Sequence, residues 1–136
     1  MLRLTHYLQT PAATVYNCLA NAEKFVRIHP LIYKAEPLGG NAYLLYERIA
    51  IGPVSVPFTY PARFTGSASC QSVTMQATIF KLVRVELLFE IGEANGQTVV
   101  EETVWFHSVL PLAWAIKPIF RQQHKAMFAK LEMIAG

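Results

Sequence analysis

The chain has 136 residues, of which 53% are hydrophobic, and its formal net charge is +3. This length predicts one domain spanning residues 1–136, and so small a positive surplus does not indicate nucleic-acid binding. All nine acidic residues are glutamates, which excludes catalytic triads built on aspartate, aspartate-led calcium loops and aspartate-rich magnesium sites.

The first 30 residues predict a strand followed by two short helices. Residues 2–9 alternate between apolar and polar side chains, which is typical of a half-buried strand. Thr10 then predicts the N-cap of a helix, with Pro11 as its first helical residue. Asn21 predicts the cap of a second helix, and Pro30 ends that helix.

The middle of the chain has the pattern of an antiparallel sheet. Glycine and asparagine turns divide it, and side chains alternate along its central segments, which predicts one buried face and one wet face. Pro57 and Pro61 interrupt one segment and indicate either an edge strand or bulges. The predicted strands are residues 31–38, 42–51, 54–65, 71–80, 82–92 and 97–108.

A long helix is predicted near the C-terminus, over residues 118–134, and Pro118 either opens it or kinks it. At about 1.5 Å per residue it extends for roughly 26 Å, which is enough to cross a sheet. Its expected apolar face consists of Ile116, Phe120, Met127, Leu131 and Ile134, and its polar face of Arg121, Gln122, Lys125 and Glu132.

Cysteine content and hydropathy bear on the compartment. Cys18 and Cys70 are too few for a disulfide framework or a cysteine-based zinc site, and they favour a reducing compartment, here the cytoplasm. The first residues lack the pattern of a signal peptide. Apolar stretches are interrupted before about 18 residues, so no transmembrane helix is predicted.

Four segments carry a resemblance to a known family. In residues 8–19 a strand ends in Thr-Pro before a helix that bears Val-Tyr and then Leu, and residues 29–32, 36–39 and 97–100 add shorter similarities. Together with the order of the elements, they resemble the SRPBCC superfamily. That superfamily includes START lipid-transfer domains, the major birch pollen allergen, polyketide cyclases and a ubiquinone-binding family.

The resemblance implies an α+β helix-grip fold: a curved antiparallel sheet of about seven strands wrapped around a long C-terminal helix, with two short helices after the first strand. It also implies a deep apolar cavity between sheet and helix, with which the high apolar content agrees. The alternative is a filled core without a ligand. No invariant catalytic motif defines the superfamily, so the resemblance implies no particular reaction.

Glu102 is the most unusual polar residue of the last predicted strand. If its apolar neighbours of the same parity face inward, Glu102 does too, and a buried carboxylate needs a partner. Arg48 or His124 would supply one, and an Arg–Glu pair would orient a polar ligand head or polarise a carbonyl. Two other interpretations stay open: the opposite parity, which places Glu102 in solvent, and a structural ion pair at the rim.

His124 and Gln123 lie beside the apolar stripe of the last helix and would border the cavity. His124 and Glu102 are the candidate catalytic residues, because an imidazole titrates near neutral pH and serves as an acid or a base. The alternatives for His124 are a histidine hydrogen-bonded to the sheet and one at the margin of the stripe with its ring in water. A satisfied core histidine is the preferred interpretation of His6. The four histidines show no ligand spacing, so neither a metal site nor a cofactor is predicted.

Aromatic and apolar residues of inward parity complete the predicted ligand-binding set. Tyr46 and Tyr60 each offer a ring and a hydroxyl, although core packing explains them equally well. The full set is Tyr46, Arg48, Phe58, Tyr60, Phe89, Glu102, Phe120, Gln123, His124 and Met127.

The outer face of the last helix carries a basic stripe of Lys117, Arg121 and Lys125, spaced four residues apart. With Trp105 and Trp114 nearby, this stripe predicts peripheral contact with an acidic membrane surface. The alternative is a solvated helix face beside core tryptophans.

Three functions fit these observations. The preferred one is binding or transport of a hydrophobic small molecule (a lipid, isoprenoid, quinone or polyketide-like compound), because no nucleophile or metal motif is present. The second is a cyclase, aromatase or dehydratase, with its polar groups drawn from Tyr46, Arg48, Glu102 and His124. The third is a protein-interaction module that uses a sheet edge or the tryptophan region. No motif identifies the ligand, the oligomeric state or the loop that gates the cavity.

Overall fold

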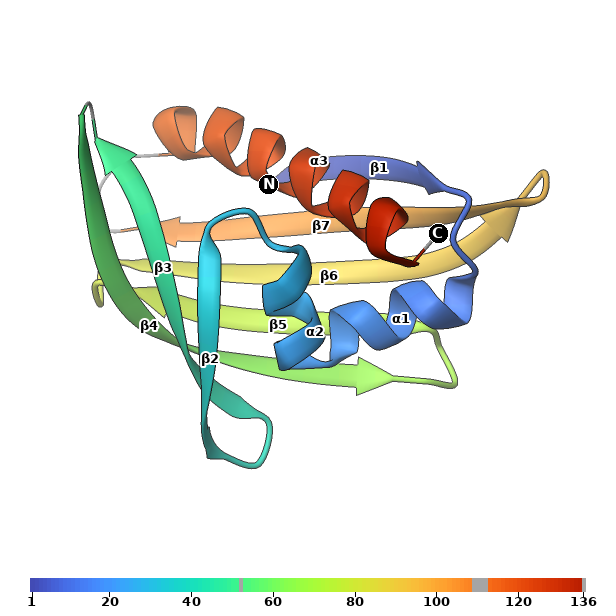
Figure 1. Cartoon of the computed structure of the whole chain (residues 1–136), viewed down its shortest axis with the longest axis horizontal. Coiled ribbons are helices and arrows are strands. Elements are labelled where there is room, and N and C mark those ends of the chain that lie inside the picture. The colour runs from blue at the N-terminus through green and yellow to red at the C-terminus, as the bar shows by residue number, and fades with distance from the viewer. Residues whose placement is uncertain (52, 109–112, 136) are drawn as a thin grey trace.

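The computed structural model describes residues 1–51, 53–108 and 113–135, with side chains described at 1–50, 53–108 and 117–134. Within these ranges the chain forms one antiparallel sheet and three helices (Figure 1). The strands are β1 (Leu2–Leu8), β2 (Ile32–Gly39), β3 (Ala42–Ile51), β4 (Val54–Ser67), β5 (Ser72–Ile79), β6 (Val83–Ala94) and β7 (Gln97–Ser108). The helices are α1 (Ala12–Ala20), α2 (Ala22–Ile28) and α3 (Ala113–Ala135).

The sheet has the strand order β1-β7-β6-β5-β4-β3-β2. Strands β2 to β7 therefore follow one another in space as they do in the chain, and β1 closes the other edge by pairing with β7. The sheet curves around the helices, and α3 passes in front of β1 and β7 (Figure 1). This is the helix-grip fold that the resemblance implies.

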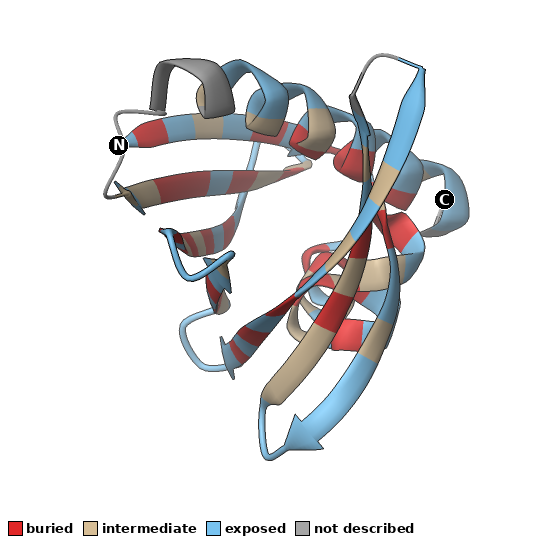
Figure 2. Ribbon diagram, turned by 90° about the vertical axis from the view of Figure 1, so that its left-hand side faces the viewer, coloured by how far each residue is buried: buried red, intermediate tan, exposed pale blue. Residues whose placement is uncertain are grey.

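Alternating burial along the strands defines the inner face of the sheet. Figure 2 shows buried and exposed bands following one another along the strands, as a sheet with one wet face requires. On β6 every odd-numbered residue from Val83 to Ile91 is buried, as the sequence predicts. The core between the sheet and the helices includes Val15, Leu19, Leu45, Val73, Phe89, Val100, Met127 and Leu131, which are fully buried.

The two short helices begin differently from one another. The Oδ1 atom of Asn21 accepts a hydrogen bond of 3.0 Å from the backbone N–H of Lys24, which confirms the predicted cap of α2. The predicted cap of α1 is wrong, because Pro11 is its N-cap residue and no side chain caps it. The Thr10 hydroxyl donates to Glu132 of α3 instead, and the Thr10 carbonyl accepts from Thr98 of β7. Thr10 thus joins the start of α1 to two other elements.

The two prolines of β4 lie in the half of that strand for which pairing is described on one side only. β4 pairs with β3 from Val54 to Arg63, without a bulge, but its described pairing with β5 begins at Ala62. The N–H of Phe64 points towards β3 and donates to Asn41, so by alternation the prolines occupy positions whose N–H would point to the other side. The edge interpretation is therefore right for this half of the strand, although β4 as a whole lies inside the sheet.

Helix α3 begins before the predicted start and contains Pro118 within it. Met127 and Leu131 are buried as predicted, and Phe128 is buried as well. Ile134 is 61% exposed, so the buried stripe ends at Leu131, whereas the side chain of Ile116 lies outside the described residues. In the described part of the chain, no helix has both the length and the hydropathy that a membrane span requires.

Replacement of Asn21 by alanine removes the side-chain acceptor at the start of α2 and should lower the free energy of unfolding by about 1 kcal/mol. Urea unfolding followed by circular dichroism measures this change. Asn17→Ala, at an exposed position within α1, is the matched control and should be neutral or slightly stabilising. Equal effects of the two substitutions would contradict the assigned cap.

Candidate functional site

A cavity of about 370 Å³ lies between the inner face of the sheet and helices α2 and α3. Its lining is mostly aliphatic and aromatic, and its volume is within the range of small-molecule sites. The sheet contributes, among others, Ile32, Val56, Met75, Ala77, Val85 and Leu87.

Five residues of the predicted ligand-binding set line this cavity. Phe58 and Tyr60 come from β4, and Phe120, Gln123 and His124 come from α3. Tyr60 and His124 are buried, while the other three are half-buried. Their position agrees with the prediction, and their part in ligand binding stays a prediction.

Phe89 and Met127 belong to the solid core and not to the described lining of the cavity. Both side chains are fully buried. The ring of Phe89 lies nearly parallel to that of His124, with 6.1 Å between centroids. Phe89 therefore supports a cavity residue instead of contacting a ligand.

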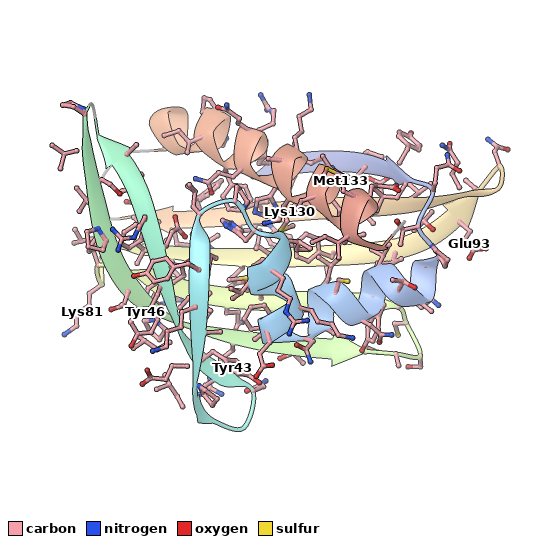
Figure 3. The ribbon with its side chains drawn as sticks, viewed as in Figure 1. Tyr43, Tyr46, Lys81, Glu93, Lys130 and Met133 are labelled. Atoms are coloured by element: carbon pink, nitrogen blue, oxygen red, sulfur yellow. The ribbon has the colours of Figure 1, made fainter. Side chains whose placement is uncertain are left out.

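Tyr46 and Arg48 were predicted to face the cavity, and this prediction is wrong. The hydroxyl of Tyr46 donates to Glu36 on β2 at 3.0 Å, and the guanidinium of Arg48 lies over the ring of Tyr33, 5.3 Å from its centroid. Figure 3 shows Tyr46 at the β2–β3 side of the sheet. Arg48 is exposed and forms no ion pair with Glu102.

The pairing of β3 with β4 explains this error. Ile51 pairs with Val54, and the register continues to Leu45, which pairs with Tyr60. Paired residues of an antiparallel sheet share a face, so the inward even-numbered residues of β4 require odd-numbered residues of β3 to face inward. The predicted strand bounds already imply this register, because one strand ends at residue 51 and the next begins at residue 54. The inward polar residue of β3 is therefore Glu47, which the sequence analysis missed.

Glu102 faces inward on β7, as its parity predicts, and is 1% exposed. Its Oε1 atom lies 3.1 Å from Nε2 of His6 on β1. Its Oε2 atom forms an ion pair with Nδ1 of His124 on α3. Of the two predicted partners, His124 is therefore the right one, and His6, which was expected to be a satisfied core residue, is the second partner.

Glu102 is ionised at neutral pH in spite of its burial. Burial raises the pKa of Glu102, but the charge and hydrogen bonding of His124 and His6 outweigh it, so that this pKa lies below its usual value. An ionised carboxylate only accepts hydrogen bonds. The facing nitrogens, Nε2 of His6 and Nδ1 of His124, therefore carry protons.

His29 is a second cavity histidine, and the sequence analysis did not identify it as a site residue. It ends α2, and its Nδ1 atom accepts hydrogen bonds from the backbone N–H groups of Leu31 and Ile32, at 3.1 and 3.0 Å. Burial, and then the charge of His124, lower the pKa of His29 to about 3. The ring is therefore neutral at physiological pH with its proton on Nε2. The sequence does contain one signal for this role, namely a histidine at the end of a predicted helix and directly before proline.

Glu47 and Tyr60 form a second buried pair in the lining. The Tyr60 hydroxyl donates to Oε1 of Glu47 at 2.8 Å. Burial raises the pKa of Glu47, against the lowering effects of Tyr60 and of the charge of His124. Burial, and then the charge of Glu47, hold the pKa of Tyr60 well above its usual value.

His29, Glu47 and His124 are close enough to interact electrostatically, so they form one polar cluster in an otherwise largely apolar lining. The rings of His29 and His124 are perpendicular, with centroids 6.2 Å apart. The cluster combines hydrogen-bond donors, acceptors and an imidazole. It can therefore hold the polar group of an apolar molecule or exchange protons with it. No group of three or more metal-ligating side chains gathers among the described residues.

Exposed apolar side chains mark the mouth of the cavity. Phe80, after β5, and Ile119, on α3, both line the cavity, yet they are 64% and 48% exposed. Lys81 follows Phe80 in the turn between β5 and β6, and it projects outward at the left of the view in Figure 3. The mouth is therefore flanked by the β5–β6 turn and by α3.

The basic stripe lies on the outside of α3. Arg121 and Lys125 are exposed and Lys117 is half-buried, as is Trp105 on β7. The side chain of Trp114 lies outside the described residues. Membrane contact through the stripe stays a prediction.

No family model matches the sequence, and no curated protein matches it. Solved structures do match over nearly its whole length. A START superfamily protein from Mycobacterium smegmatis has a TM-score of 0.74 at 14% identity, covering 98% of this chain and 95% of its own. The Zhui aromatase/cyclase from Streptomyces sp. R1128 has a TM-score of 0.71 at 12% identity, covering 98% and 92%. Ara h 8.0201 has a TM-score of 0.77 at 13% identity, covering 98% and 95%.

Identities this low concern the fold alone. The three structures carry names of different kinds, a START protein, an aromatase/cyclase and Ara h 8.0201, yet each covers almost the whole chain. The chain therefore shares the helix-grip fold of these three structures, which is the fold that the sequence resemblance implies.

The buried, neutral state of His29 should make the protein sensitive to acid. The folded-state pKa, about 3, lies below the ordinary 6.5, so the unfolded chain binds the proton first as the pH falls. The stability that His29 contributes is complete above about pH 6.5 and declines towards pH 3, by up to about 1.4 kcal/mol per pH unit. Urea unfolding at several pH values between 7 and 4.5 measures this slope.

His29→Asn keeps an acceptor near the position of Nδ1 but does not titrate, so its unfolding free energy should vary less over the same pH range. His107→Asn, at an exposed position on β7, is the control and should keep the wild-type slope. A wild-type slope in His29→Asn would refute the assigned state of His29.

Proposed function

We propose that this protein binds an apolar small molecule, such as a lipid, isoprenoid, quinone or polyketide-like compound, in the cavity between the sheet and α3. One observation carries the proposal: a cavity of about 370 Å³ whose largely apolar lining contains a single cluster of buried polar groups. An apolar lining favours a hydrophobic molecule through burial of its surface, and a few polar groups fix its orientation.

The position of the cavity also supports binding. Exposed Phe80 and Ile119 extend the apolar lining to the molecular surface, which gives a hydrophobic molecule a route to the interior. A START protein and an aromatase/cyclase share this fold, and their names agree with either of the first two functions that the sequence favours. The third, an interaction module with a filled interior, receives less support because the interior holds a cavity.

One observation favours the second function, an enzyme of the cyclase, aromatase or dehydratase type. His124 lines the cavity, and the buried carboxylate of Glu102 contacts Nδ1 of its ring. This arrangement suits acid–base chemistry. Tyr46 and Arg48 take no part in it, because both lie outside the cavity.

Ala77→Phe tests the proposed site directly. Ala77 is a buried residue of the cavity lining on β5, and a phenyl group there occupies space that a ligand needs. We expect the affinity for the fluorescent fatty acid 11-(dansylamino)undecanoic acid to fall by about tenfold or more. The measurement is a fluorescence titration of wild type and variant.

Thr78→Phe is the matched control, because the neighbouring side chain is exposed on the opposite face of β5. It should retain the wild-type affinity within about twofold. If Ala77→Phe, with its melting temperature unchanged, bound the probe as tightly as wild type, the ligand would not lie in this cavity. Native mass spectrometry of the gently purified protein then identifies any molecule that it carries.

A further inference from the structure

His124 lines the cavity, and one of its two ring nitrogens is occupied by a contact within the protein. Nδ1 is engaged by Glu102, and Nε2 lies on the other side of the imidazole, where no described residue hydrogen-bonds to it. When the ring is neutral, its one proton lies on Nδ1, which faces the carboxylate, so that Nε2 holds a lone pair. His124 is thus in the tautomer that a general base requires, with a carboxylate behind it.

The surroundings of His124 fix this orientation. Its ring stacks on Phe120, with 3.9 Å between centroids and an interplanar angle of 28°, and it lies nearly parallel to Phe89. The other oxygen of Glu102 is held by His6, whose ring stacks on Phe128 at 4.1 Å. Neither the imidazole nor the carboxylate can turn without breaking packed contacts, so the base is preorganised.

His29 supplies a donor close to this base. Its Nδ1 atom is saturated by two backbone N–H groups, which leaves Nε2–H as the donating edge of a cavity residue. With 6.2 Å between the two ring centroids, one carbonyl group and the carbon next to it can contact both rings. A donor in this position stabilises negative charge on the carbonyl oxygen.

From this arrangement we infer that His124 is a catalytic base, positioned by Glu102, that removes a proton from the carbon next to the carbonyl of an apolar ketone. The inference rests on the proposed binding of an apolar molecule in the cavity. The Nε2 lone pair takes the proton, the C–H electron pair forms the C=C bond of an enolate, and the carbonyl π electrons move to oxygen. That oxygen accepts a hydrogen bond from Nε2–H of His29, and protonated His124 is stabilised by Glu102.

Return of the proton to carbon regenerates the ketone, so the cycle needs no further reactant. Where the ketone carries a hydroxyl on the β carbon, the carbonyl re-forms, the C=C electrons of the enolate form a double bond between the α and β carbons, and the β C–O bond breaks. The proton on His124 converts the leaving hydroxide to water. The structure thereby assigns proton transfer to His124, charge stabilisation to His29 and positioning to Glu102.

Exchange of the α-hydrogens of 2-tetralone for deuterium tests the inference, because this exchange is the proposed proton transfer itself. The protein is mixed with 2-tetralone in deuterium oxide, and the loss of the α-hydrogen signals is followed by proton NMR. We expect wild type to accelerate exchange by about 100-fold or more relative to His124→Gln, since a positioned base contributes roughly 10²–10⁴-fold. His107→Gln, at an exposed position, is the control and should exchange at the wild-type rate.

Two further variants separate the roles and serve if His124→Gln fails to fold. His29→Asn keeps a side-chain acceptor for the two backbone N–H groups but loses the Nε2–H donor, and should slow exchange by about 10-fold or more, with a smaller loss of tetralone affinity. Glu102→Gln should slow exchange and lower the pH at which its rate is half-maximal, because a negative charge that favours protonated His124 is removed. The other titratable groups near His124, namely His29, Glu47 and (behind Glu102) His6, are the same in that variant. A purely structural role of Glu102 would leave that pH in place.

The possible outcomes distinguish this inference from the proposed binding. If tetralone binds to wild type but its α-hydrogens exchange no faster there than with His124→Gln or Glu102→Gln, the catalytic assignment is overturned. The binding proposal then still stands. Failure to bind tetralone, when the dansylated fatty acid binds, overturns the ketone as the substrate class. Failure to bind either molecule overturns both proposals.

Discussion

The buried carboxylate of Glu102 connects the parts of this structure. It lies on β7, and its two oxygens meet His6 from β1 and His124 from α3, so one side chain joins the edge of the sheet to the helix that the sheet encloses. A buried carboxylate is costly unless donors satisfy it. The position of α3 over the sheet, the orientation of the cavity imidazole and the ionisation of Glu102 therefore depend on one another.

The fold was largely readable from the sequence because its signals are local and repeated. Alternation fixed the face of β6, turn residues divided the strands, and Asn21 marked a helix start. The inward position of Glu102 also followed from alternation. Of its two partners, His124 was one of two candidates and His6 was not identified, because β1, β7 and α3 are distant in the chain and only the fold brings their side chains together.

The errors have physical causes of the same kind. Both faces of β3 carry aromatic and aliphatic residues, so composition could not choose between Tyr46 and Glu47, and only the pairing with β4 decides. His29 was not identified because its role comes from hydrogen bonds with two backbone N–H groups, and its position at a helix end before proline is only an indirect sign of them. Threonine is a residue type that is favoured at helix N-caps, yet the hydroxyl of Thr10 donates to Glu132, which is more than a hundred residues away in the chain.

The prolines of β4 have a consequence for how molecules of this protein meet one another. The half of β4 before Ala62 has no described pairing with β5, and unpaired strand edges are templates onto which a strand of another molecule can add. At Pro57 and Pro61 that edge has no N–H group to offer, and an incoming strand would find gaps at alternate bonding positions. The unpaired half of β4, which contributes Val56 and Phe58 to the cavity lining, thus offers no continuous row of N–H groups to a strand of a second molecule.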